Sequence, residues 1–469
     1  MKHPFQHVLL DKTGEYFFAA AINSVFLFKL SGSDSGDAKL LGSWTDEVDP
    51  YYTIRKHHKE LLEQYEQQQK EKKEREEKLK KEAEGSNDTV NENNKRELVP
   101  EIPEEQIPTS TKQIMNKKPK LPLPGPGAPP TYTYIRDMCL SRNNRYLIVT
   151  TDNDKAVVVF EIDYSNTDGN VFKLIKRQPM SKRPSAVCTS MDDSTIIIAD
   201  KFGDVYSIPM TDPTVFDDSK LKPILGHVSM LTCVQNAVDE EGKEVIMTAD
   251  RDEHIRISYF PKSYVIKKIL FGHREFISCF VLPKWCDGKV LVSAGGDPYI
   301  CTWIWQSTGE LKELKSKVSV ESLVKDKLNE KHLAPEKFQN EAGDLVEFCI
   351  SKIVPLNKTQ QIAVIFEKIP SLFVFDLTKE GDLTFAREYP VHSDIITATA
   401  SNDQFICSFD AMDQCLQFFD INDDKTLQVS PHTETLLKAI DDANDAVIGD
   451  IDEMIPLFNV YYMRKRREH

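Results

Sequence analysis

Four segments of the chain superimpose without gaps and constrain the fold more than any other feature. They are TTDNDKAVVVF (150–160), IADKFGDVYSI (198–208), TADRDEHIRIS (248–258) and SAGGDPYICTW (293–303). Each combines a small or apolar strand end, an acidic or glycine-bearing turn, and a strand of alternating pattern. Their fifth position holds Asp154, Phe202, Asp252 and Asp297, at separations of 48, 50 and 45 residues. A period of about 45 residues with four short strands per unit is typical of β-propellers of the WD40 type.

Further copies of the unit bring the count to seven. FDAMDQCLQFF (409–419) fits the same template, and degenerate copies occur near the start of the chain and at 363–377. We therefore expect an all-β, seven-bladed WD40-type β-propeller, with blades at roughly 3–48, 131–180, 184–219, 222–268, 269–315, 345–385 and 392–463. The final apolar run, IPLFNVYYM (455–463), is expected to help close the ring by pairing terminal segments, which removes open sheet edges.

A charged insertion interrupts the repeat. Residues 55–84 lack Gly and Pro and are dominated by Glu, Lys and Gln, which predicts a solvated helix fading into disorder by residue 120. Apolar positions are too few to sustain a coiled coil. The expected organisation is blade 1 at 1–48, a charged and Pro-rich insertion at 49–130, blades 2–7 at 131–463 and a basic tail at 464–469.

Two histidines occupy a position with a structural explanation. Gly226-His227 and Gly272-His273 precede the third and fourth of the four segments. In this class of repeat a His, a Ser or Thr, a turn Asp and a Trp form a buried hydrogen-bonded set, whose members would each cost about 1–3 kcal/mol if buried without a partner. The expected sets are His273, Ser293, Asp297 and Trp303, and His227, Thr248 and Asp252 with Ser258 at the Trp position. Both histidines are therefore interpreted as structural, rather than as catalytic bases.

The distribution of charge limits the classes of partner. The formal net charge is −15, and residues 55–120 hold 16 basic and 15 acidic side chains, leaving 43 basic against 59 acidic elsewhere. The folded part is therefore acidic, whereas a free-standing nucleic-acid binder needs a basic surface to neutralise phosphates. Any contact with RNA is expected from a local patch or through a partner.

The sequence contains no recognisable catalytic or metal-binding pattern. No G-x-G-x-x-G opens a helix after a strand, and neither G-x-S-x-G nor H-E-x-x-H occurs. The nine cysteines include no C-x-x-C pair and no Cys/His cluster at zinc spacing, so we expect reduced thiols and no metal. The apolar stretch near the N-terminus is broken by Asn23, which argues against a signal peptide or membrane span. An enzyme with its own cofactor is therefore not expected.

Charged residues cluster instead on neighbouring blades. SKRPSAV (181–187) leads into one blade, ADKFGD (199–204) is its turn, and DRDEHIR (250–256) is the turn and strand of the next. Because adjacent blades place equivalent turns side by side, Lys182, Arg183, Lys201, Glu253 and Arg256 are expected in one mixed-charge patch. Such a patch suits a protein partner, since opposite charges fix register and steer encounter. An ordinary exposed rim remains the alternative.

These same strings, together with IIIADKFGDVYSI, PILGHVSMLT, LFGHREF, LVSAGGD, HLAPEKFQNE and PGPGAPPTYTYIRD, resemble one family closely. The sequence is similar to the fungal WD-repeat, non-catalytic subunit of the tRNA (guanine-N7-)-methyltransferase. The resemblance spans nearly the whole chain apart from the charged insertion, whose role it leaves unassigned.

The resemblance implies a propeller without an active site that binds a separate catalytic subunit in a heterodimer. That subunit would hold S-adenosylmethionine and methylate a guanine in the tRNA variable loop, so tRNA would be met through the complex. The family's interface positions match Lys182, Lys201, Asp252, Glu253 and Arg256, with Arg183 beside them. Arg256 would then pair with an acidic group of the partner, and Glu253 or Asp252 with a basic one.

Two further expectations stay open at the level of sequence. A generic propeller scaffold for protein complexes explains the fold equally but not the charged strings. The basic runs NKKPK (116–120) and RKRR (464–467) suit a nuclear-import signal, an RNA contact or a solvated tail. With the resemblance, they suggest residence in the nucleus.

Overall fold

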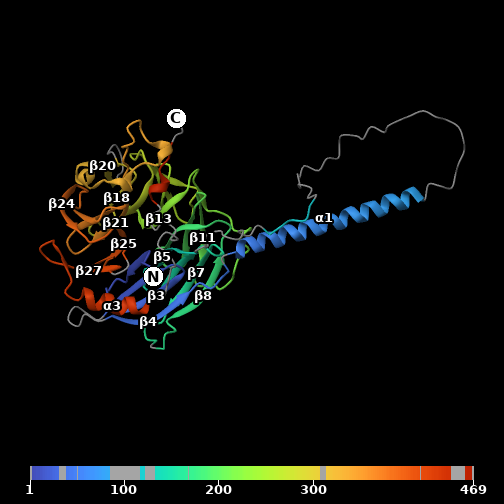
Figure 1. Cartoon of the computed structure of the whole chain (residues 1–469), viewed down its shortest axis with the longest axis horizontal. Coiled ribbons are helices and arrows are strands. Elements are labelled where there is room, and N and C mark those ends of the chain that lie inside the picture. The colour runs from blue at the N-terminus through green and yellow to red at the C-terminus, as the bar shows by residue number, and fades with distance from the viewer. Residues whose placement is uncertain are drawn as a thin grey trace. The chain divides into compact units, whose positions relative to one another are not determined.

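The computed structural model describes residues 3–30, 38–49, 51–84, 117–121, 133–166, 168–306, 313–411, 414–444 and 460–466. Two compact units are present: Met1–Pro50 with Pro129–His469, and Tyr51–Ala128. Figure 1 shows the strands of the first unit and the long helix of the second. The second unit lies within the predicted insertion, 49–130.

In the described residues, seven antiparallel four-stranded sheets form, each from four strands consecutive in the chain. The first three are β1 (His7–Leu10), β2 (Tyr16–Ala21), β3 (Ser24–Leu30), β4 (Ala38–Thr45); β5 (Ile135–Leu140), β6 (Tyr146–Thr151), β7 (Ala156–Ile162), β8 (Phe172–Pro179); and β9 (Pro184–Thr189), β10 (Thr195–Asp200), β11 (Asp204–Pro209), β12 (Leu225–Gly226). The other four are β13 (Leu231–Val238), β14 (Glu244–Asp250), β15 (Ile255–Tyr259), β16 (Ile266–Leu270); β17 (Ile277–Val281), β18 (Val290–Gly295), β19 (Tyr299–Ile304), β20 (Leu314–Ser319); β21 (Ile350–Leu356), β22 (Gln361–Phe366), β23 (Ser371–Leu377), β24 (Leu383–Pro390); and β25 (Ile395–Ala400), β26 (Gln404–Phe409), β27 (Leu416–Ile421), β28 (Leu427–Val429).

The sheets are the blades of a closed ring. The first strand of each sheet contacts that of the next, from β1 through β5, β9, β13, β17 and β21 to β25, and β25 contacts β1. The predicted seven-bladed propeller is therefore confirmed.

The core lies between neighbouring blades. Every residue of β22 is buried, whereas most of the outer strand β24 is exposed or partly exposed. The second strand of a blade is covered on both faces by the adjacent blades, so its sequence is a mainly apolar run, as in β2, β6, β10 and β22. Clusters such as Ile197, Ala199, Val205 and Leu225 with Leu231 and Ile246 join one sheet to the next.

In the described residues, contacts between the first and last blades close the ring. The first sheet is made wholly of N-terminal residues and the last ends at Val429. Closure comes from buried contacts: the Ser408 hydroxyl donates to the Phe5 carbonyl at 2.6 Å, and the Asn444 amide to the His3 carbonyl at 2.9 Å. Within the predicted closing strand, Tyr461–Met463 form a 3-10 helix, η6, and residues 455–459 lie outside the described part.

Blade boundaries also differ in places. The third blade gains its outer strand, β12, only after a long connection, because TDPTVFDDSKLKP (211–223) is rich in Pro and Asp and does not pair. β20 runs to Ser319, beyond the expected boundary at 315. Short helices fill the connections: η1 (Lys284–Cys286), α2 (Glu321–Val324), η2 (Lys325–Lys327), η3 (Glu330–His332), η4 (Glu336–Phe338) and α3 (Thr433–Ala443).

In the second unit, the helix predicted over 55–84 forms as α1 (Tyr52–Glu84). Its surface is polar, with pairs such as Gln67 and Glu71 one turn apart. The predicted disorder at 85–116 and the Pro-rich run at 122–132 lie outside the described residues. No helix in the described part combines the length and apolarity needed to cross a bilayer.

Candidate functional site

The predicted docking residues gather on one face of the ring, where the innermost strands begin. Lys182 and Arg183 lead into β9, and Lys201 lies in the turn between β10 and β11, with its backbone N–H donating to the Arg183 carbonyl at 3.1 Å. Asp252 and Glu253 lie in the corresponding turn between β14 and β15. Because β9 contacts β13, these two turns belong to neighbouring blades of one surface, the docking face.

Two lysines of the docking face hold their ammonium groups against one exposed ring. The Nζ atoms of Lys182 and Lys201 lie 4.5 and 5.4 Å from the centre of Phe202, whose side chain is 54% exposed. Among the described residues neither lysine has a carboxylate partner. An exposed cation–π contact contributes only about 0.5–1 kcal/mol, so both charges stay available to a partner.

The two turns share one conformation. In each, the last residue of the second strand is an aspartate, Asp200 or Asp250, whose Oδ1 accepts from the backbone N–H groups two and four residues later. The residue three positions after it has positive φ, 102° at Gly203 and 77° at Glu253. A side chain in this region costs about 1–2 kcal/mol. Glu253 is therefore held in a strained, defined conformation on the face, which favours a role in binding.

Other predicted residues already have partners within the chain. Asp252 forms a 2.6 Å ion pair with Lys465 of the C-terminal segment. Arg183 lies 3.7 Å from Asp152, a carboxylate that Arg136 grips through three nitrogen–oxygen contacts of 2.6 to 2.8 Å. Burial lowers the pKa of Arg183, and the positive charge of Arg136 lowers it further. Of the two arginines beside Asp152, Arg183 is therefore held less tightly than Arg136.

Arg256 is tied down inside its own blade. Its guanidinium donates to the Ser258 hydroxyl at 2.9 Å and to the carbonyls of Gly226 and Ser263 at 3.0 and 3.2 Å. Ser258, which receives one of these bonds, aligns in sequence with Trp303 of the neighbouring blade. Three of its five N–H groups are thereby used, and a partner's carboxylate would have to meet the other two.

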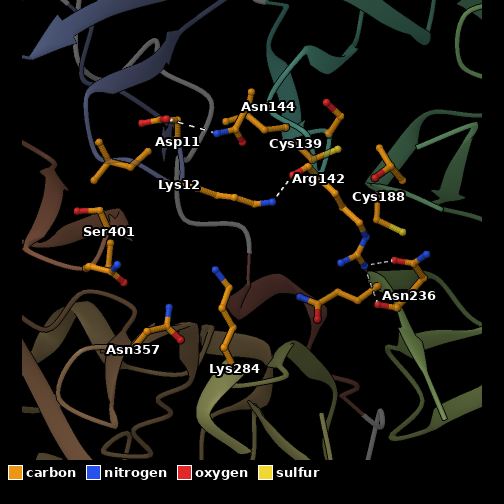
Figure 2. A pocket seen from close by; sticks show the side chains of 17 residues that line it. Asp11, Lys12, Cys139, Arg142, Asn144, Cys188, Asn236, Lys284, Asn357 and Ser401 are labelled. Carbon is orange, nitrogen blue, oxygen red and sulfur yellow. Dashed lines mark hydrogen bonds between the residues drawn. The ribbon is translucent and has the colours of Figure 1, made fainter. Parts of the chain in front are cut away.

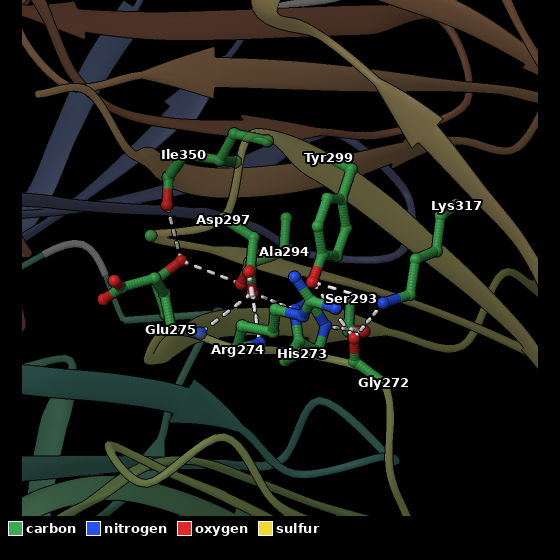
Figure 3. A network of polar contacts seen from close by, with 12 residues as sticks. Gly272, His273, Arg274, Glu275, Ser293, Ala294, Asp297, Tyr299, Lys317 and Ile350 are labelled. Atoms are coloured by element: carbon green, nitrogen blue, oxygen red, sulfur yellow. Dashed lines mark hydrogen bonds and ion pairs between the residues drawn. The ribbon is translucent and has the colours of Figure 1, made fainter.

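The hydrogen-bonded set of the fifth blade is complete. Figure 3 shows three of its members, His273, Ser293 and Asp297, side by side. His273 Nδ1 lies 2.7 Å from Asp297, its Nε2 lies 2.7 Å from the Ser293 hydroxyl, and Trp303 Nε1 donates to Ser293 at 2.8 Å. Although burial raises the pKa of Asp297, the hydrogen bond and charge of His273 bring the pKa below its ordinary value. The set ties the start of the blade to its second and third strands, so His273 is structural.

The set of the fourth blade differs from the expectation. His227 Nε2 lies 2.8 Å from Thr248, as the alignment predicts, but Nδ1 lies 2.8 Å from Asp250 and not Asp252. A carboxylate can reach the ring from either end of the turn, and in this blade it comes from the strand end. Asp252 is partly buried and pairs with Lys465 instead, so its assignment to the set is corrected.

The docking face also surrounds a central cleft of about 770 Å³ that sequence reasoning missed. Its cationic lining comes from four blades: Arg136, Arg183, Lys201, Arg251 and Lys352. Burial lowers the pKa of Lys352 and raises that of the neighbouring Asp137 to about 6. Arg136 and Lys352 lie on the innermost strands of two blades that are far apart in the chain, and Arg183, Lys201 and Arg251 lie in loops of two others. No spacing in the sequence relates these four blades, because only ring closure brings them around one cleft.

A second opening of about 330 Å³ lies at the other ends of the innermost strands. Figure 2 shows Lys12, Arg142 and Lys284 reaching into it from three blades. Arg142 donates to the Asn236 side chain and carbonyl, and Lys12 to the Arg142 carbonyl. Its remaining lining is mainly amide and hydroxyl side chains. In the described residues no group of three or more His, Cys, Asp or Glu could hold a metal ion.

Comparison with known proteins identifies the family. The profile of the tRNA methyltransferase TRM82 WD40 domain matches residues 17–221 and 214–429. The chain belongs to this family. It is 39% identical over its whole length to the whole of the tRNA (guanine-N(7)-)-methyltransferase non-catalytic subunit TRM82 of Debaryomyces hansenii. The proteins of that name from Kluyveromyces lactis (41% identity, 86% of this chain, 83% of the relative) and Saccharomyces cerevisiae (33%, 100% and 99%) are also similar.

The resemblance to this family noted in the sequence is thereby confirmed. Each of these relatives is named as non-catalytic, which bears out the expectation that the TRM82-like chain is not itself an enzyme. The match covers the propeller, and the docking face with its Lys182, Lys201 and Glu253 lies inside the matched residues.

Proposed function

We propose that this chain is the non-catalytic subunit of a tRNA N7-methylguanosine methyltransferase. It binds and stabilises a separate catalytic subunit in a heterodimer, and the pair methylates a guanine in the tRNA variable loop. Membership of the TRM82 family is the observation that carries this proposal. S-adenosylmethionine is then a ligand of the catalytic subunit, and the propeller binds no cofactor of its own.

The geometry of the docking face supports a protein partner. It combines two lysines that meet no carboxylate within the described part of the chain, an exposed aromatic ring and a strained glutamate, all within two adjacent blades. Aromatic residues are enriched at protein interfaces, and charges of both signs fix register and suppress wrong partners. The residues assigned to the interface are Lys182, Arg183, Lys201, Asp252, Glu253 and Arg256.

The overall charge supports a tRNA-binding role for the catalytic subunit rather than for the propeller. The formal net charge of −15 opposes independent binding of tRNA, since affinity for phosphates requires neutralising cations. Most of the contact with tRNA therefore belongs to the catalytic subunit, with Lys182 and Arg183 contributing at its edge. Residence in the nucleus and the absence of any membrane association are part of the same proposal.

Co-purification with the tRNA guanine-N7 methyltransferase of the same organism tests the assignment. We expect a one-to-one complex and methylation of tRNA only when both chains are present. Lys201→Glu should abolish or strongly weaken the complex while the propeller stays folded. Lys222→Glu, an exposed lysine in the connection before β12, is the matched control and should bind normally.

Two results would contradict the proposal. A catalytic chain equally active and stable alone would leave this protein a generic propeller scaffold. Stoichiometric binding of labelled S-adenosylmethionine to the isolated propeller, measured by equilibrium dialysis, would make it an enzyme instead.

A further inference from the structure

The C-terminal segment 460–466 lies across the docking face and contacts three blades. It begins with η6, whose Met463 carbonyl accepts a 2.6 Å hydrogen bond from Arg251 in the turn of the fourth blade. Tyr462 and Met463 line the central cleft. Of the basic residues that follow, Arg464 and Arg466 reach the fifth and sixth blades.

Arg464 is held in a formed site. It donates to the carbonyls of Gly296 and Phe348 at 2.8 and 3.0 Å, and lies 3.2 Å from Glu275 and 3.8 Å from Glu347. Its side chain is only 14% exposed. Carbonyls and carboxylates from two blades thus contact a guanidinium that is largely shielded from water. Such convergent acceptors are typical of a specific arginine site.

The two neighbouring cations extend this contact. Arg466 lies 2.5 Å from Glu347 and is 13% exposed, and its guanidinium stacks 5.3 Å from the centre of Phe338. Lys465 points the other way, to Asp252 at 2.6 Å, and is 47% exposed. The segment therefore has two mostly covered arginine anchors on either side of one exposed lysine.

The surface beneath the segment is acidic. Burial raises the pKa of Glu275, and the negative charges of Asp297, Glu253 and Glu347 act in the same direction, while Arg464 opposes them. Without the segment, these carboxylates would repel one another in a partly buried site. The basic segment is therefore electrostatically complementary to this half of the docking face.

We propose that residues 460–466 form a latch in cis: Arg464 and Arg466 fasten the segment to the acidic site, and Lys465 competes with the catalytic subunit for Asp252. The second part rests on the proposed function. The partner gains Asp252 only by displacing an exposed lysine, whose ion pair is weak in water, while the two mostly covered arginines keep the segment in place. The latch thereby sets the affinity of the heterodimer without blocking it.

Limited trypsin digestion of the full chain tests the anchoring without any partner. Trypsin must take Arg464 or Arg466 into its own acidic pocket, so the latch should protect the bonds after both residues. Glu347→Gln should raise the rate of tail cleavage at least about tenfold, because it removes the charge that pairs with both arginines. Glu341→Gln, an exposed neighbour, should not, and cleavage at exposed Lys72 in α1 calibrates the protease. Equal tail cleavage in wild type and Glu347→Gln would overturn the latch.

Binding to the catalytic subunit tests the competition. Lys465→Ala should strengthen the heterodimer by about three- to tenfold, and should change nothing in an Asp252→Asn background. A weaker or unchanged complex with Lys465→Ala would overturn competition at Asp252. If the wild-type chain forms no complex at all, the proposed function fails, and the trypsin result alone decides the latch.

Discussion

His227 and Asp250 are joined by a 2.8 Å contact between the histidine Nδ1 and a carboxylate oxygen, and both side chains are almost fully buried. The same carboxylate accepts two backbone N–H groups of the following turn. We predict that Asp250→Ala destabilises the propeller by about 1–3 kcal/mol for each buried donor left without an acceptor. Asp252→Ala should change the free energy of unfolding by no more than about 0.5 kcal/mol. Urea unfolding of the two variants measures the difference, and equal losses would restore the alignment-based assignment.

Ser293 connects His273 to Trp303. His273 contacts Asp297 through Nδ1 and the Ser293 hydroxyl through Nε2, and the same hydroxyl accepts the indole N–H of Trp303. Ser293→Ala removes both bonds from a fully buried site, so we expect a loss of about 2–4 kcal/mol. Ser293→Thr keeps the hydroxyl, and threonine fills the same place in the fourth blade as Thr248. In thermal unfolding, the melting temperature of Ser293→Thr should therefore lie well above that of Ser293→Ala. The reverse order would contradict this role of the hydroxyl.

Arg177 joins the first two blades through buried carboxylates. Its guanidinium lies 3.0 Å from Asp46 and 2.6 Å from Asp154, and both acids are at most 5% exposed. Arg177→Met leaves two buried charges unpaired, so we expect a loss of about 3–5 kcal/mol in the free energy of unfolding. Arg145→Met, which breaks an exposed pair with Glu161, is the control and should have little effect. Denaturant unfolding of both variants provides the measurement.

His3 makes stability depend on pH. Burial lowers its pKa from 6.5 to about 4, and its ring packs on Tyr134 with centroids 5.6 Å apart. A histidine whose pKa is lowered by folding stabilises the fold fully above pH 6.5, and this contribution is lost as the pH falls towards 4. Stability should therefore fall on acidification through this window, and His3→Phe should reduce that slope. Thermal unfolding at pH 7 and pH 5 measures it, and an unchanged slope would assign the effect to other groups such as His7.

Phe202 offers a test of the docking face that leaves the fold intact. The ring is 54% exposed and holds the ammonium groups of Lys182 and Lys201 against it. Phe202→Ser should weaken binding to the catalytic subunit by about tenfold or more, because interface aromatics are common hot spots. The melting temperature should barely change. Val215→Ser, at an exposed apolar residue (55%) in the connection before β12, is the matched control.

The amino-acid sequence by itself determined the propeller. The repeat of turn and alternating strand reports local conformation, and blades consist of strands consecutive in the chain, so their number and order follow from counting. The set around His273 was equally accessible, because its members lie at fixed offsets within one blade. The lysines beside Phe202 could be assigned to one surface, since adjacent turns in a ring share a face.

Only the tertiary structure decided which charges are available. Positions 250 and 252 are both aspartates, and the conformation of the turn determines that Asp250 is the one that reaches His227. The pairing of Lys465 with Asp252 and the burial of Arg464 between Glu275 and Glu347 join residues far apart in the chain. The cleft lined by Arg136, Arg251 and Lys352 likewise exists only once the ring has closed. Local patterns specify strands and turns, whereas electrostatic partners depend on distances in space that sequence separation does not encode.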